Sequence, residues 1–173
     1  MNNTKRMILS ALLVAMGVVL PMAFHSIPNA GSVFLPMHIP VLLCGLICGW
    51  PYGLACGVLA PLLSSLMTGM PPAAILPGML CELAVYGLVS GLLLKVIHTR
   101  RTIVDLYASL LGTMISGRLV AGVLNALIFR AGSYSLAMWT TASFVTALPG
   151  IAIQLVLIPL LVMALQRAGL IKR

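Results

Sequence analysis

The sequence is poor in charged residues, and above all in acids. Asp, Glu, Lys and Arg together make up 7% of its 173 residues, and the two acids are Glu82 and Asp105. Hydrophobic residues make up 61%. The chain has no carboxylate pair within one helix for general acid–base catalysis, no phosphate-binding glycine loop and no Ser-His-Asp arrangement. We therefore do not expect an enzyme.

Metal-binding patterns are scarce as well. The four cysteines are Cys44, Cys48, Cys56 and Cys81, and all lie in apolar stretches that we expect to be helical. Cys44 and Cys48 share a helix face that could hold a soft metal ion, but no His, Asp or Glu lies nearby on that face. Cysteine packs as a small apolar residue in such surroundings. We favour packing, and we expect neither a metal site nor a cofactor.

The basic residues are gathered in three clusters, with long apolar stretches between them. Lys and Arg beside membrane-spanning helices are retained on the cytoplasmic side. The clusters therefore mark three cytoplasmic segments, and they supply most of the net charge of +8. This placement favours contact with anionic lipid headgroups and argues against a nucleic-acid partner. The clusters are Lys5 and Arg6; Lys95, Arg100 and Arg101; and Arg167, Lys172 and Arg173.

The apolar stretches have room for six spanning helices. A span needs about 20 residues, so residues 7–94 hold four spans and residues 102–166 hold two, which leaves both termini cytoplasmic. The sequence thus predicts an all-α integral membrane protein, with six transmembrane helices in a single domain over residues 1–173. Proline and glycine place these helices at 7–24 and 36–49, from the 49–52 turn to about 67, and at 74–97, 103–129 and 138–166.

Several local expectations accompany this topology. The first segment lacks a small-x-small cleavage site, so we interpret it as a retained helix and not as a secretory signal. The 36–49 helix is short for a span, and we expect it to be tilted, extended by its loop or shielded by protein. Asp105 is expected in the first turn of its helix, where a negative charge is favourable. Gln154 is expected to form an interhelical hydrogen bond.

Two charged side chains fall inside predicted spans. At 1.5 Å per residue, Glu82 lies about 12 Å below the outer edge, and Arg118 lies about 22 Å above the inner edge of a core about 30 Å thick. Both therefore lie at similar depth in the outer half of the membrane. A charge there costs at least about 2.5 kcal/mol unless it is paired or hydrated. Two interpretations remain open: an ion pair that joins two helices, or, as we favour, a polar pocket that meets a solute.

Polar neighbours favour the pocket. One helix face carries, at spacings of four and seven residues, Arg118, Gly122 and Asn125. Another face carries, at every fourth position, Glu82, Tyr86 and Ser90. The outer helix ends add His38, Arg130, Tyr134, Trp139, Thr140 and Thr141, of which the base and the aromatics could instead anchor at lipid headgroups. The candidate binding residues are His38, Glu82, Tyr86, Arg118, Asn125, Arg130 and Trp139.

Small residues four positions apart form faces on several helices. Such faces let helices approach one another closely in lipid, where hydrophobicity alone does not drive their association. The pairs are Ala11/Ala15, Gly45/Gly49, Gly53/Gly57 and Gly87/Gly91.

Several features occur together over the whole chain. It has six helices with basic ends, the Ala11/Ala15 face on the first helix, the segment 37–72, and Gly117-Arg118 followed by Gly122. This combination resembles the substrate-binding S component of energy-coupling factor (ECF) vitamin transporters of the bacterial cell membrane. The resemblance implies that the Ala11/Ala15 face docks onto the transmembrane T subunit.

The resemblance also implies where the solute binds. The site would lie near the outer face, between the last three helices, with loops at about 25–35, 68–73 and 130–138 as its cap. Residues 25–36 contain Pro28, Asn29 and Gly31 and have no helical period, so we expect an ordered non-helical loop over the outer opening.

The transport mechanism follows from the same resemblance. The protein would bind a water-soluble vitamin or vitamin precursor, and two cytoplasmic ATPase subunits would drive the T subunit and the release of the cargo inside. The alternative is a self-sufficient, proton-coupled secondary carrier that uses Glu82, although the chain has no internal repeat of the kind common in such carriers. The cargo stays open: a zwitterion or weak anion such as pantothenate or a folate-like acid fits, as does a neutral heterocycle if Glu82 and Arg118 neutralise each other.

Overall fold

The computed structural model describes residues 1–24, 29–99 and 101–171. Within these ranges all regular secondary structure is helical, and six segments are long and apolar enough to span a membrane. This confirms the predicted all-α architecture of six transmembrane helices. The six segments are α1 (Asn3–Ala23), α2 with α3 (Ala30–Cys48), α4 (Trp50–Thr68), α5 (Leu76–Val96), α6 with the π-helix η1 (Thr102–Phe129) and α8 (Leu148–Arg167).

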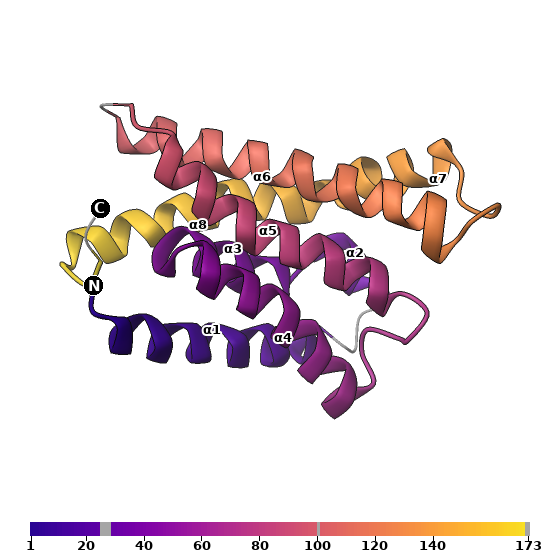
Figure 1. The fold of residues 1–173 in the computed structure, drawn as a ribbon, viewed down its shortest axis with the longest axis horizontal. Helices are drawn as coiled ribbons and strands as arrows, with labels where there is room; N and C mark the ends of the chain where they lie inside the picture. The colour runs from indigo at the N-terminus through magenta and orange to yellow at the C-terminus, as the bar shows by residue number, and fades with distance from the viewer. Residues whose placement is uncertain (25–28, 100, 172–173) are drawn as a thin grey trace.

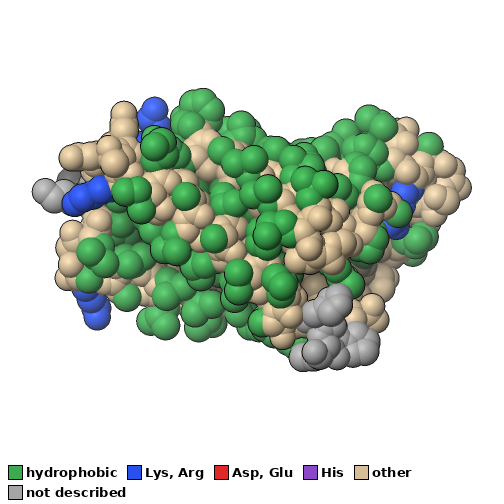
Figure 2. Space-filling model, turned by 90° about the horizontal axis from the view of Figure 1, so that it is seen from below, with side chains coloured by type: hydrophobic (Ala, Val, Ile, Leu, Met, Phe, Trp, Pro, Cys, Tyr) green, Lys and Arg blue, Asp and Glu red, His purple; other side chains and the backbone are tan. Residues whose placement is uncertain are grey.

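The two ends of the bundle differ in charge. α1 begins, and α8 ends, at the same end of the bundle as the connection between α5 and α6 (Figure 1). This end, which we call the inner end, carries Lys5, Lys95, Arg101 and Arg167. Hydrophobic side chains cover the middle of the face in Figure 2, and Lys and Arg side chains lie near its ends. The positive-inside rule assigns the inner end to the cytoplasm, and we call the opposite end the outer end.

Glycine lets α3, α4 and α5 pack with their backbones in contact. A Cβ atom on Gly53 or on Gly87 would overlap the backbone of the other residue, and one on Gly91 would overlap the backbone of Trp50. The glycine faces predicted from the sequence therefore serve packing inside this chain. Cys44, Cys48 and Cys56 are buried free thiols in the same region.

Proline and glycine define where helices begin. Gly49 separates α3 from α4 with a φ of 96°, a backbone conformation that residues with a Cβ rarely adopt. Pro51, Pro77 and Pro149 lie in the first turns of α4, α5 and α8, where the missing N–H of proline costs no hydrogen bond.

The predicted helix over residues 138–166 is wrong in its first third. Residues there form α7 (Leu136–Thr140) and a second π-helix, η2 (Thr141–Thr146), and the spanning helix α8 starts at Leu148. The physical reason is Pro149, which interrupts the hydrogen-bond ladder of a continuous helix and is tolerated in the first turn of a new one. The change places residues 141–146 beside the outer end of the bundle instead of within a straight span.

The expectation of a non-helical segment over residues 25–36 also needs correction. Residues Ala30–Phe34 form the short helix α2, while residues 25–28 lie outside the described part of the chain. With α2, the span from Ala30 to Cys48 reaches 19 residues. The predicted helix at 36–49 is therefore extended by the segment before it, which was one of the three explanations for its short length.

Of the two remaining local expectations, the structure confirms the one for Asp105 and not the one for Gln154. Asp105 lies in the first turn of α6, as predicted, and accepts hydrogen bonds from the Thr99 hydroxyl and from the Thr99 amide at 2.9 Å. Gln154 is buried, but its Nε2 has no hydrogen-bond partner among the described residues. The interhelical hydrogen bond that we expected from this amide group is therefore not formed.

Candidate functional site

A cavity of about 580 Å³ lies near the outer end of the bundle. Its size falls in the range of pockets that enclose small organic molecules, about 300–1,000 Å³. All three segments expected to cap a site contribute to its wall. The wall comprises the end of α1, the outer parts of α5 and α6, and Asn125. It is completed by residues 29–32, 35–38 and 70–72 and by residues 130, 134, 139, 142, 143 and 147.

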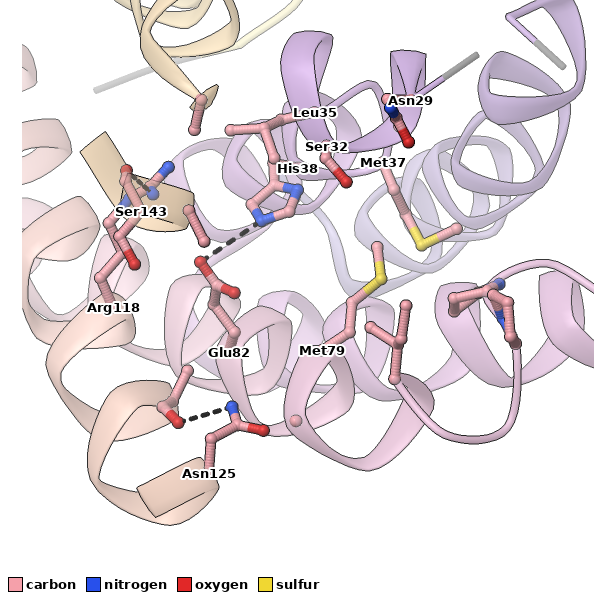
Figure 3. Close-up of a pocket in the computed structure, with 18 of the residues that line it drawn as sticks. Asn29, Ser32, Leu35, Met37, His38, Met79, Glu82, Arg118, Asn125 and Ser143 are labelled. Carbon is pink, nitrogen blue, oxygen red and sulfur yellow. Dashed lines mark hydrogen bonds and ion pairs between the residues drawn. The ribbon is translucent and has the colours of Figure 1, made fainter. Parts of the chain in front are cut away.

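Glu82 on α5 faces His38 at the start of α3. The His38 Nε2 atom lies 3.6 Å from the Glu82 Oε1 atom, and Figure 3 shows the two side chains pointing toward one another. The His38 ring is buried and packs edge-on against the Tyr86 ring, with 5.2 Å between the centroids. Neither ring nitrogen of His38 has a hydrogen-bond partner among the described residues. Glu82 is therefore compensated through an ion pair whenever His38 is protonated.

Arg118 on α6 is held by the π-helix η2. Its side chain is buried, its Nη1 donates a hydrogen bond to the Ser143 carbonyl oxygen, and its guanidinium lies 5.8 Å from the centre of the Phe144 ring. Among the described residues no carboxylate lies within ion-pair distance of Arg118. The alternative of a direct Glu82–Arg118 ion pair is therefore wrong: both residues line one cavity, and each has another neighbour.

Trp139 closes one side of the site against α6. Its indole Nε1 donates a hydrogen bond to the Arg118 carbonyl oxygen at 3.0 Å, and its ring covers Gly122, where a Cβ atom would overlap the indole. The Trp139 ring also packs edge-on against Phe144, with 5.4 Å between centroids. The Trp139 indole thus occupies the space that the missing side chain of Gly122 leaves beside Arg118.

Asn125 marks the point where α6 becomes a π-helix. Its Nδ2 donates a hydrogen bond to the Ala121 carbonyl oxygen at 2.8 Å, and its side chain packs against Gly78 of α5. Single π-helical turns inside a helix are rare and are frequent at functional sites. Here the wider turn begins at a residue that lines the cavity.

The outer base Arg130 lines the same cavity. Its guanidinium lies 6.0 Å from the centre of the Tyr134 ring, and Tyr134 lines the cavity too. Burial raises the pKa of the Tyr134 hydroxyl above its ordinary value, with smaller contributions from Arg130, which lowers it, and Glu82. Tyr134 therefore stays neutral at physiological pH, and Arg130 contributes a positive charge.

Six of the seven candidate residues line the cavity, and Tyr86 does not. The Tyr86 ring is fully buried against Gly117, and its hydroxyl donates a long hydrogen bond to the Met114 carbonyl oxygen at 3.4 Å. The Tyr86 ring instead packs against the His38 ring, which does line the cavity. The two threonines named at the outer helix ends, Thr140 and Thr141, are likewise absent from the cavity wall, as far as the described residues define it.

Three polar residues of the cavity wall were missed from the sequence: Asn29, Ser32 and Ser143. Asn29 and Ser32 fall within residues 25–36, which were expected to lie over the outer opening, but neither was named as a binding residue. The carbonyl oxygen of Ser143 leaves no sequence signal, because any residue could supply it.

Ala11 and Ala15 lie on the outside of the bundle. Both are exposed, whereas Leu13, Gly17 and Val18 form the buried face of α1. The alanines are therefore free to meet another helix. Gly17 is used inside the protein, because a Cβ atom there would approach that of Ala60 to 2.8 Å.

Comparison with known proteins gives one match. The family model described as "ECF transporter, substrate-specific component" matches residues 5–162. No curated protein and no solved structure matches the chain. The match covers all six spans up to the last turns of α8, and it includes the cavity and the exposed face of α1.

Proposed function

The chain belongs to the family of substrate-specific components of ECF transporters, and we propose that it captures a water-soluble vitamin or vitamin precursor at the outer face of a bacterial cell membrane. It is a membrane-embedded transport subunit with six spans. Within the proposal, the cavity at the outer end binds the solute before import. The candidate site residues are the six that line this cavity, with Tyr86 as their support.

The observation that carries this proposal is the pair of charged side chains in the outer cavity. Glu82 and Arg118 line one cavity inside the spanning region, and neither neutralises the other by direct contact. Charged groups at such depth are costly, and intramembrane charges most often serve a transported or bound solute. A cavity of about 580 Å³ gives that solute room.

The proposed partners are the transmembrane T subunit and two cytoplasmic ATPase subunits. The sequence has no phosphate-binding loop of its own, so within this proposal the energy for import comes from those partners. The exposed Ala11/Ala15 face of α1 offers a second helix a close approach, which in lipid is the main source of helix association. This face lies on α1, away from the charged side chains of α5 and α6.

Uptake into vesicles tests the proposal. Vesicles that contain this chain, the T subunit and both ATPases should take up solute in an ATP-dependent manner. Replacing both alanines by tryptophan (Ala11→Trp, Ala15→Trp) should abolish uptake and copurification with the T subunit, while solute affinity in detergent stays within a few-fold of wild type, because the cavity is untouched.

A matched control uses a different lipid-exposed face. Leu111 and Ile115 of α6 are exposed and are also four residues apart, so the double variant Leu111→Trp, Ile115→Trp places the same two tryptophan side chains on another face. It should transport normally. Normal transport by the alanine double variant would reject α1 as the docking surface. Uptake by the unmodified chain without any ATPase would instead support the self-sufficient carrier.

A further inference from the structure

We propose that the solute is a small organic monocarboxylate that also carries a hydroxyl or N–H donor, with its carboxylate bound at Arg118 and its donor group at Glu82. This inference rests on the proposed function, because it identifies the chemical class of the ligand of the same cavity. It depends on the charge balance of the cavity and on the hydrogen-bonding groups that the protein leaves unused.

The charge balance of the cavity favours an anion. The charged residues among the described lining are Arg118, Arg130 and Glu82, so the cavity carries one net positive charge when His38 is neutral. Protonation of His38 adds a second. A monoanion therefore brings the site to neutrality or close to it, whereas a cation would add to an existing excess in surroundings of low polarity. A phosphate dianion would overcompensate the site with neutral His38.

The unused hydrogen-bonding capacity of Arg118 points to a carboxylate. A guanidinium has five N–H donors in a planar fork that matches a carboxylate. In the described structure its one hydrogen-bond acceptor is the Ser143 carbonyl oxygen, which takes Nη1, and the buried Nε has none. A buried cation with one acceptor and no carboxylate within ion-pair distance among the described residues is an expensive arrangement. A ligand carboxylate would supply both the acceptors and the charge.

Glu82 requires a hydrogen-bond donor from the ligand, whereas Arg118 requires an acceptor. Its carboxylate accepts hydrogen bonds and cannot donate them when ionised. Its side chain keeps 21% of its surface exposed toward the cavity, while that of its partner His38 keeps 3%. An acidic group alone would be repelled here, so the ligand needs a hydroxyl or an N–H at this point. Arg118 and Glu82 together therefore orient an asymmetric molecule.

Arg130 gives the anion a second cation. It lines the same cavity from the segment after η1, its guanidinium lies near the Tyr134 ring, and no carboxylate among the described residues forms an ion pair with it. Because it lies outside the predicted spans, replacing it removes a positive charge without opening a gap in the helix packing.

Capture of the ligand from a complex mixture tests the inference. The full chain, purified in detergent, is incubated with yeast extract, washed and denatured, and the released compound is identified by mass spectrometry and by anion exchange. We expect a compound without phosphorus that is retained at neutral pH, released at acidic pH and converted to a methyl ester. The captured acid and its primary amide are then compared as ligands, and the amide should bind at least about tenfold more weakly.

Variants of Arg130 and Arg118 test whether these two residues bind the carboxylate of the ligand. Arg130→Gln should weaken binding of the acid by about three- to tenfold and leave binding of the amide unchanged. Lys95→Gln, which removes a positive charge at the inner end, is the matched control and should change neither. Arg118→Lys, which keeps the charge but not the fork, should lose most of the preference for the acid. If that variant does not fold, Arg130→Gln still decides the question.

The possible outcomes separate this inference from the proposed function. Capture of a neutral, cationic or phosphorylated compound would overturn the inference and leave the proposed function intact, as would equal affinity for the acid and its amide. An equal loss of acid and amide binding in Arg130→Gln would also overturn the inference and leave the proposed function intact. Failure to capture any compound would overturn the proposed function itself.

Discussion

Around Gly53 and Gly87 the backbones of α4 and α5 meet without room for a methyl group, whereas around Arg118 the helices of the same bundle separate around a cavity of about 580 Å³. The glycine contacts involve regular α-helices. The cavity is bordered by residues of two π-helical segments, η1 and η2, and by the His38 ring nitrogens and the Arg118 Nε, which have no hydrogen-bond partner in the described part of the chain.

The difference shows how one small bundle separates stability from binding. Close backbone contact in lipid supplies the packing energy that hydrophobicity does not supply there. Sites that bind a solute instead keep open space and unused hydrogen-bonding groups, and these cost stability. The two properties belong to different elements, so substitutions should affect them separately.

The largest effect is expected from a methyl group in the glycine contact. Gly53→Ala places a Cβ atom onto the backbone of Gly87, which cannot move without shifting α5. We expect the free energy of unfolding to fall by at least about 2 kcal/mol. Thermal unfolding in detergent measures it.

The control for this variant comes from the cavity region. Gly31 of α2 has no atom within 4 Å of the position of an added Cβ, so Gly31→Ala should unfold within about 1 kcal/mol of the wild type. If the two alanine variants were equally stable, the glycine contact would not be the source of stability that the comparison requires.

The next effect is on binding. Arg118→Ala removes the buried guanidinium but leaves the glycine contacts unchanged, so we expect solute affinity to fall by at least about 100-fold while the protein still inserts and folds. Affinity and melting temperature are measured on the same sample. Unchanged affinity would remove Arg118 from the site, and loss of folding would make it a structural residue.

A second variant sharpens the same test. If Glu82 and Arg118 only neutralised each other, the double variant Arg118→Ala, Glu82→Gln would recover what either single change loses. Since Glu82 is paired with His38 and Arg118 with the Ser143 carbonyl oxygen, we expect no recovery of solute affinity. Recovery would restore the interpretation of a mutual ion pair.

The sequence predicted the features that depend on local pattern. Runs of apolar residues and clusters of Lys and Arg give the six spans, because span length and loop charge are properties of neighbouring residues. The same counting along two helices placed Glu82 and Arg118 at one depth, and both line one cavity. Apart from the start of α8, the helix ends at proline and glycine were predicted to within a few residues.

Most of the features that were missed, though not the break before α8, depend on contacts between distant segments. His38 was placed at an outer helix end, but its pairing with Glu82 follows from how α3 packs on α5. The break before α8 did have a local signal: Leu148-Pro149-Gly150 repeats Leu76-Pro77-Gly78, which starts α5. The two π-helices, η1 and η2, have no comparable local signal.

The smallest expected effect compares the two tryptophans of the chain, one in each region. Trp139→Phe keeps an aromatic ring against Phe144 but loses the hydrogen bond from the indole to the Arg118 carbonyl oxygen. We expect the free energy of unfolding to fall by about 0.5–1.5 kcal/mol and solute affinity to fall a few-fold, because that hydrogen bond joins α7 to the proposed anion-binding residue Arg118. Trp50→Phe, at the partly exposed start of α4, is the matched control and should leave affinity unchanged.

Because Trp50 contributes its backbone and not its indole to the contact with Gly91, an equal loss of affinity in both variants would mean that the glycine-packed region and the cavity are coupled. Binding would then respond to the stiffness of the whole bundle, and the division between the two regions would be wrong.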